Sequence, residues 1–335
     1  MPFQFDQAVL CPTCPHGFCF EDRRANPVRG RSTQFRLNQG VAMHCTFEEF
    51  LPGGSNDPDP SRSFDDYLGQ FRENAKGAGG IRAGSDFSLS TSALAKVEGD
   101  VFELMEAGIL WEAAAAWNRF MDSGLWDSDV FQCPAGAVAA ASRKIAIVKL
   151  PRGYDTTRLF KADVRSSILA FEQALKLQGM ELGLSSPDIV GVRLPHPLPP
   201  ELQVFLQPMG NLSGSTQILL AEAHRKLEGL IAGSGFLMAI AVKRTTRSDR
   251  LYQPLFEANV LKYLIQSVLE GAAFRFYAHL GSFEGADVQG HYSAASLISL
   301  LRGGQPSKAV DVLYLAKKPR ETGQSLLNEF PLFPI

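Results

Sequence analysis

The feature that most constrains the fold is an uninterrupted apolar run, Gly235-Phe-Leu-Met-Ala-Ile-Ala-Val242, which ends abruptly at Lys243. A short apolar run bounded by polar residues is typical of a buried strand. The residues that follow are charged, and they include Arg244, Arg247, Asp249 and Arg250. A helical pattern containing Glu257 comes next. One strand–loop–helix unit therefore carries a lysine, several arginines and a carboxylate.

Further apolar runs of strand length occur along the chain. They cover residues 145–148, 189–192, 272–280 and 310–315. Helical patterns lie between them, and the strongest spans 92–122, where apolar residues recur at helical spacing. Strands that alternate with helices in this way indicate an α/β domain.

The composition is that of a globular chain, with 335 residues of which 45% are hydrophobic and 20% are charged. No segment approaches the roughly 18 consecutive apolar residues of a membrane helix, and the N-terminus lacks the regions of a signal peptide. We therefore expect a cytoplasmic protein without membrane contacts. The net charge of −2 gives no overall attraction to nucleic acid, so a DNA-binding chain of this composition must concentrate positive charge locally.

Positive charge is concentrated in the first 50 residues. Five arginines lie within fourteen positions: Arg23, Arg24, Arg29, Arg31 and Arg36. This pattern predicts a basic N-terminal arm at 1–50 and a main domain at 51–335. A segment at 52–61 that is rich in turn-forming residues is expected to be a surface loop.

The cysteines argue against a disulfide framework, because a large chain with five of them has an odd number. Cys11, Cys14 and Cys19, with His16 or Cys45, could form a zinc site, since two cysteines three positions apart are a familiar zinc-binding corner. The second half of such a motif is missing. We therefore favour free thiols over zinc.

Charged residues near strand ends suggest phosphodiester hydrolysis. This reaction needs an activated water, stabilisation of negative charge on the phosphate, and a leaving oxygen that is protonated or bound to metal. Asp188 begins one predicted strand and Lys243 ends another, so adjacent strands would bring them together. Glu257 shares a helical face with Leu261 and Leu264, and a buried carboxylate needs a cation, a metal or a hydrogen-bond partner.

Each of these residues also has an ordinary interpretation. Asp188 follows Ser-Pro and could simply form a turn, and Lys243 could be a surface lysine that extends to solvent. Glu257 could pair with a nearby arginine, and Glu103 could be a solvated helix residue. The hypothesis of a nuclease site rests on their combination with the arginine-rich loop.

Residues 26–35, 95–103 and 243–259 (KRTTRSDRLYQPLFEAN), with Ser186-Pro187-Asp188 in the expected order, form a specific pattern that spans residues 23–300. The pattern resembles the type II restriction endonucleases that recognise sites with a CCGG core, within the PD-(D/E)xK nuclease superfamily. The resemblance implies a restriction-endonuclease-like PD-(D/E)xK core, in which a central mixed β-sheet is flanked by helices, with an N-terminal arm.

The resemblance also implies the residues of the active site. Asp188 and Glu257 would bind metal, Glu103 would contribute a further acidic metal ligand, and Lys243 would be the catalytic lysine. In the generic superfamily an acid lies two residues before the lysine, where this chain has Ala241. The CCGG enzymes carry that acid on the following helix, and Glu257 lies fourteen residues after Lys243. The implied cofactor is Mg²⁺, with one or two ions per site and Mn²⁺ as a substitute.

For DNA recognition, the resemblance assigns Arg247, Asp249 and Arg250 to the CCGG core. Arginine can bond guanine O6 and N7 together, and aspartate can accept from cytosine N4. Arg31 would read outer base pairs and Lys96 would contact the DNA backbone. For each arginine, the alternative is a nonspecific phosphate contact.

The expected function is therefore that of a homodimeric type II restriction endonuclease on a palindromic duplex, since two-fold protein symmetry matches two-fold DNA symmetry. By resemblance, the cut precedes the CCGG core and leaves 5′ overhangs, the longer site CR|CCGGYG is one form of the target, and larger assemblies on DNA are compatible with the dimer. Two alternatives stay open. They are a repair or mobile-element nuclease of the same fold, and a noncatalytic sequence-specific DNA-binding protein.

Overall fold

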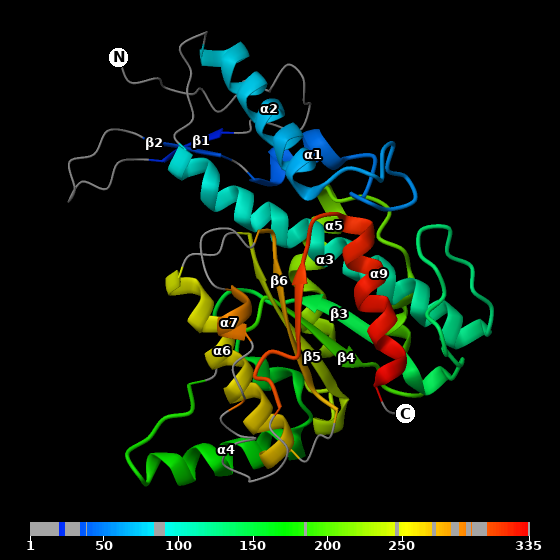
Figure 1. Ribbon diagram of the computed structural model, residues 1–335, viewed down its shortest axis with the longest axis vertical. Helices are drawn as coiled ribbons and strands as arrows, with labels where there is room; N and C mark the ends of the chain where they lie inside the picture. The colour runs from blue at the N-terminus through cyan, green and yellow to red at the C-terminus, as the bar shows by residue number, and fades with distance from the viewer. Residues whose placement is uncertain are drawn as a thin grey trace.

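The computed structural model (Figure 1) describes residues 20–23, 34–37, 39–83, 91–183, 186–244, 248–269, 273–282, 288–292, 296 and 307–333. At residues 20–23, 34–37, 39–41, 76–83, 91–96, 248–251, 267, 289 and 291 the description covers the backbone and not the side chains. No helix among the described residues is long and apolar enough to cross a membrane.

A five-stranded mixed sheet forms the centre of the protein. Its strands, in spatial order, are β3 (Ile145–Lys149), β4 (Ile189–Arg193), β5 (Phe236–Lys243), β6 (Arg275–Leu280) and β7 (Val312–Leu315). The pairs β3–β4 and β4–β5 are antiparallel, whereas β5–β6 and β6–β7 are parallel. The apolar runs of the sequence overlap these strands, although the runs 272–280 and 310–315 begin before β6 and β7 do. The predicted α/β fold with a mixed sheet is confirmed.

Strand β5 is the middle strand of the sheet, and all its residues are buried except Lys243 at its end. Its neighbours pack closely. A Cβ atom added at Gly191 of β4 would lie 2.5 Å from Met238 Cγ and 2.9 Å from Ile147 Cδ1. Only glycine leaves room here for side chains from both neighbouring strands. The β4–β5 register shifts between Gly191 and Val192.

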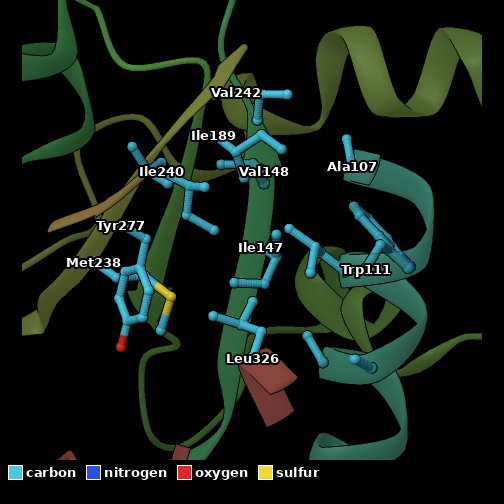
Figure 2. Packing of buried hydrophobic residues seen from close by; sticks show 14 of the residues in the cluster. Ala107, Trp111, Ile147, Val148, Ile189, Met238, Ile240, Val242, Tyr277 and Leu326 are labelled. Carbon is cyan, nitrogen blue, oxygen red and sulfur yellow. The ribbon is translucent and has the colours of Figure 1, made fainter. Parts of the chain in front are cut away.

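Helices cover the sheet on both sides. In Figure 1, α3 (Thr91–Ser123) and α9 (Pro319–Glu329) lie on one side, and α4 (Ala162–Lys176), α6 (Ser248–Tyr263) and α7 (Val288–Tyr292) lie on the other. Figure 2 shows Ala107 and Trp111 of α3 on the side of β3 that carries Ile147, with Leu326 of α9 near Ile147. This packing places the N-terminal half of α3 near the end of β3.

A buried asparagine fastens α3 to the sheet. Asn118 is fully buried, and its Nδ2 donates to the carbonyl oxygens of Ile145, at 2.8 Å, and of Phe205, at 2.9 Å. Its Oδ1 accepts from the Ile145 N–H at 2.7 Å. Because β3 is an edge strand, the N–H and C=O of Ile145 that face away from β4 would otherwise lack partners, so Asn118 sets the position of the helix along the strand.

The remaining elements lie around this core. They are the antiparallel pair β1 (Phe20–Arg23) and β2 (Gln34–Leu37), and the helices α1 (Gln39–Phe47), α2 (Phe64–Ala83) and α5 (Gly214–Glu222). Short 3₁₀ turns occur at Ala141–Arg143, Thr156–Leu159, Pro200–Leu206, Ala223–Leu227, Gly233–Gly235 and Phe330–Leu332, and α6 continues as a π-helical segment at Leu264–Val268.

Helix α1 lies within the predicted N-terminal arm, 1–50. Its residues Ala42, Met43 and Phe47 are fully buried, and the helix contacts α2, α3 and α5. The C-terminal part of the arm is therefore packed on the main body of the protein. The division between 1–50 and 51–335 stays a prediction.

Candidate active site

A cleft of about 770 Å³ opens at the edge of the sheet where β3 and β5 end and β4 begins. Helices α3, α5 and α6 and the segments 150–152 and 186–187 contribute the rest of its wall. The side chains that line the cleft are Asp100, Glu103, Leu104, Lys149, Leu150, Pro151, Arg152, Ser186, Pro187, Asp188, Gln217, Ala221, Lys243 and Gln253. Three of the four predicted catalytic residues are among them.

Asp188 and Lys243 meet across the β4–β5 pair. Because these strands are antiparallel, the start of β4 lies beside the end of β5. Lys243 Nζ lies 2.7 Å from Asp188 Oδ2, and the Val242 N–H donates to the same oxygen at 2.8 Å. The backbone thus orients the carboxylate and the lysine balances its charge. The expected meeting of the two residues is observed, and their catalytic roles stay predictions.

Glu103 enters the same cleft from α3 and pairs with a lysine of its own, since its Oε1 lies 2.6 Å from Lys149 Nζ. Burial and then the negative charge of Asp188 raise the pKa of Glu103, whereas the ammonium groups of Lys149 and Lys243 oppose this rise. Asp188 and Glu103 line the same cleft, and the negative charge of Asp188 disfavours ionisation of Glu103. The site thus holds two carboxylate–lysine pairs.

Sequence reasoning missed Lys149 as a functional residue. A signal for it was present, because Lys149 ends the apolar run of β3 as Lys243 ends that of β5. Strand β3 is antiparallel to β4, with Lys149 opposite Ile189, so its end also lies beside Asp188. Gln253 of α6 and Arg152 are two further polar residues of the cleft that the sequence did not single out.

Glu257 lies one turn of α6 beyond Gln253 and is 2% exposed. The Gln253 side chain donates to Glu257 Oε1 at 2.8 Å, and Gln253 itself lines the cleft, whereas Glu257 does not. Burial, and then the negative charge of Glu257, raise the pKa of Tyr292. The predicted position of Glu257 on a buried helical face is confirmed, and Gln253 links it to the cleft.

The metal-binding potential of the cleft lies in its carboxylates. Within the described part of the chain, no group of three or more His, Cys, Asp or Glu side chains is arranged to hold a metal ion. Asp188 and Glu103 nevertheless provide two oxygen donors on one cleft, which is the kind of donor that Mg²⁺ prefers, and one or two carboxylates suffice to bind it. The donor set therefore fits Mg²⁺.

The predicted DNA-recognition residues are described only in part. Arg31 and Arg247 lie outside the described residues. Asp249 and Arg250 belong to the first turn of α6, and Lys96 to α3, but their side chains are not described. Helix α6 starts five residues after Lys243, so its first turn follows the lysine of the cleft closely along the chain.

The predicted cysteine-rich segment, Cys11, Cys14, His16 and Cys19, also lies outside the described residues. Two cysteines belong to the described residues. Cys45 is partly buried in α1, and Cys133 is exposed.

An ionic cluster joins the end of β5 to α3. Arg244 contacts Glu98 directly, and Glu98 also pairs with Arg72 of α2 at 3.1 Å. Arg244 lies 3.6 Å from Asp65. Glu98 precedes Glu103 on α3, and Arg244 follows Lys243, so this cluster fixes α3 and the end of β5 relative to one another.

Comparisons with known proteins show the family and the fold of the chain. The sequence model of the family described as Cfr10I/Bse634I restriction endonuclease matches residues 60–329. The fold is similar to a solved structure described as type IIF restriction endonuclease Bse634I with cognate DNA. That match has a TM-score of 0.73 and 18% identity, and it covers 93% of this chain and 97% of the other.

A second solved structure, described as Bse634I restriction endonuclease, matches with a TM-score of 0.71 and the same identity and coverage. No curated protein matches the chain. The structural likeness confirms the restriction-endonuclease-like α/β fold, with a mixed sheet flanked by helices.

Proposed function

Because the chain belongs to the Cfr10I/Bse634I restriction endonuclease family, it is a type II site-specific deoxyribonuclease, and we propose that it cuts duplex DNA in a Mg²⁺-dependent reaction at a palindromic site with a CCGG core. The proposed cut precedes the core and leaves 5′ overhangs. The sequence also resembles the SgrAI restriction enzyme, which supports the longer site CR|CCGGYG. The proposed setting is the cytoplasm.

The observation that carries the proposal is the contact between Asp188 and Lys243 in a cleft that Glu103 also enters. In the hydrolysis of a phosphodiester, a water adds to phosphorus and the bond to one ester oxygen breaks. The Lys243 ammonium is placed to orient the water or to stabilise the negative charge that grows on the phosphate. Asp188 keeps this lysine in the cleft.

We propose Asp188, Glu103 and Glu257 as the residues that hold Mg²⁺, with Mn²⁺ as a substitute and one or two ions per site. When bound, Mg²⁺ supplies a more acidic water and neutralises charge on the phosphate. Asp188 and Glu103 line the cleft directly, and Gln253 joins Glu257 to it through a 2.8 Å hydrogen bond. A bound cation would relieve the repulsion between the first two carboxylates.

The proposal assigns base reading to Arg247, Asp249 and Arg250, a role in reading outer base pairs to Arg31, and a DNA-backbone contact to Lys96. Its support is the short connection between Lys243 and α6. The first turn of α6 follows β5 closely along the chain. A contact between a side chain of this turn and a DNA base would therefore help to position the catalytic lysine at the end of β5. The proposed active form is a homodimer, in which each subunit reads half of the site and cuts one strand, and larger assemblies on DNA are compatible with it.

The test is digestion of mixed-sequence duplex DNA in Mg²⁺, followed by sequencing of the ends. We expect ends with 5′ overhangs that border CCGG. Asp188→Ala should lower the cleavage rate by at least about 100-fold, since loss of a metal ligand costs more than loss of its supporting contacts. Asp122→Ala is the matched control, because Asp122 pairs with Lys144 outside the cleft and its loss should leave the rate unchanged.

Two outcomes would contradict the proposal. Random or blunt ends would exclude the CCGG assignment. Absence of cleavage by the wild type at any sequence would exclude the reaction itself for this chain.

A further inference from the structure

Acidic and basic side chains are balanced in the cleft. Among the described residues that line it, Asp100, Glu103 and Asp188 are acidic, and Lys149, Arg152 and Lys243 are basic. A cleft without net charge attracts neither a cation nor a phosphate strongly. If a divalent cation binds to the carboxylates, the cleft becomes positive and attracts phosphate. Binding of metal and binding of DNA would then strengthen each other.

The two lysines that pair with carboxylates differ in how their partners are held. Asp188 is fixed by the Val242 N–H as well as by Lys243. Within the described part of the chain, the ionic partner of Glu103 is Lys149. Both members of this second pair have long side chains, and their side chains keep 17% and 19% of their surface exposed to solvent. Because both side chains are long, their charged ends can separate without any movement of the backbone. Asn118 meanwhile holds α3 and β3 in place.

The cleft also offers the Lys149 ammonium group a second position, near Arg152. Lys149 ends β3, and the following residues Leu150, Pro151 and Arg152 line the same cleft. Arg152 is exposed, and it also lines a second hollow of about 500 Å³ that adjoins the cleft at Ser186 and Gln253. An ammonium group released from Glu103 would join the Arg152 guanidinium, and the two positive charges together would attract a phosphate.

We propose that Lys149 is a displaceable counter-ion of Glu103: it balances this carboxylate when metal is absent, and it is released to a DNA phosphate when metal binds. This inference rests on the proposed function, because it assumes that Glu103 faces the metal. Lys149 thereby acts as a positioning residue whose release couples the binding of metal to that of DNA.

The decisive measurement is metal affinity without DNA. Isothermal titration calorimetry with Mn²⁺ would compare the wild type with Lys149→Met, which removes the charge and keeps most of the side-chain length. Because the lysine no longer competes for Glu103, we expect Mn²⁺ to bind about fivefold more tightly to the variant, the effect of losing one partly exposed ion pair. A residue that only supports the structure would not raise affinity when removed. Equal or weaker Mn²⁺ binding by a folded Lys149→Met would overturn the proposal.

The matched control is Lys144→Met. Lys144 precedes β3 as Lys149 ends it, and it pairs with Asp122 of the same helix α3, but outside the cleft. Its loss should leave Mn²⁺ affinity unchanged. In the Glu103→Gln background, Lys149→Met should also have no effect on Mn²⁺ affinity, and a remaining effect there would contradict a role exerted through Glu103.

DNA binding provides a second readout, which applies even if Lys149→Met does not fold. Fluorescence anisotropy with a short CCGG duplex would compare EDTA with Ca²⁺, for the wild type and for Lys149→Gln. We expect Ca²⁺ to tighten DNA binding less in Lys149→Gln, because the released ammonium is missing. An equal gain in both proteins would overturn the coupling. The proposed function has a separate test: it would be wrong if the wild type left DNA uncut in Mg²⁺, whatever the result for the Lys149 variants.

Discussion

Asn118 allows a prediction whose magnitude follows from the structure. In Asn118→Ala, three backbone groups lose their partners: the N–H and C=O of Ile145 and the C=O of Phe205. Each unsatisfied buried group costs about 1–3 kcal/mol. Because local relaxation and entry of water recover part of this cost, we expect the free energy of unfolding to fall by about 3–4 kcal/mol.

Urea unfolding followed by circular dichroism would measure this loss. Asn328→Ala is the matched control, since Asn328 is an exposed asparagine on α9 that accepts a hydrogen bond from Gln324. An exposed substitution of this kind should change stability by no more than about 0.5 kcal/mol. If Asn118→Ala cost no more than the control, the idea that this side chain fastens α3 to β3 would be wrong.

Three further predictions concern the sheet, the metal site and DNA recognition. Gly191→Ala should destabilise the protein by about 1–3 kcal/mol in urea unfolding, because the new Cβ would lie 2.5 Å from Met238 Cγ; an unchanged midpoint would contradict this packing. If Glu103 binds metal as proposed, Mn²⁺ binding needs its ionised form, so affinity is full above the pKa of this group and is lost as the pH falls through it. Because that pKa is raised, calorimetry should show the loss starting at a higher pH than for an ordinary glutamate, and Glu103→Gln should remove this component. Arg250→Ala should lose site preference in DNA-binding assays and keep salt-sensitive nonspecific binding, whereas unchanged specificity would exclude it from base reading.

The strands could be predicted from the sequence because their apolar runs are short, continuous and bounded by polar residues. The run 235–242 became β5 with a difference of one residue at each end, and Lys243 is its partly exposed last residue. Glu257 was expected on a buried helical face for an equally local reason, and it is 2% exposed on α6. Patterns of this kind depend only on residues within a few positions of one another, so the sequence alone reveals them.

Lys149 shows why the rest of the site could not be predicted. Its sequence context is nearly the same as that of Lys144, since both flank the apolar run of β3. One lysine faces Asp122 outside the cleft and the other faces Glu103 within it. Which end of the strand lies at the cleft depends on the antiparallel pairing with β4 and on how far α3 is shifted along β3.

The sequence by itself therefore determined the strand–loop–helix unit that carries Lys243 and Glu257, and the α/β class of the fold, because local periodicity and apolar runs specify both. The meeting of Asp188 with Lys243 was expected from their places at strand ends, whereas only the tertiary structure decided that Glu103 meets Lys149 and that the two pairs share one cleft. These residues come from α3, β3, the start of β4 and the end of β5. The pairing of strands and the packing of a helix on them join these elements, and such long-range contacts leave no local pattern in the chain.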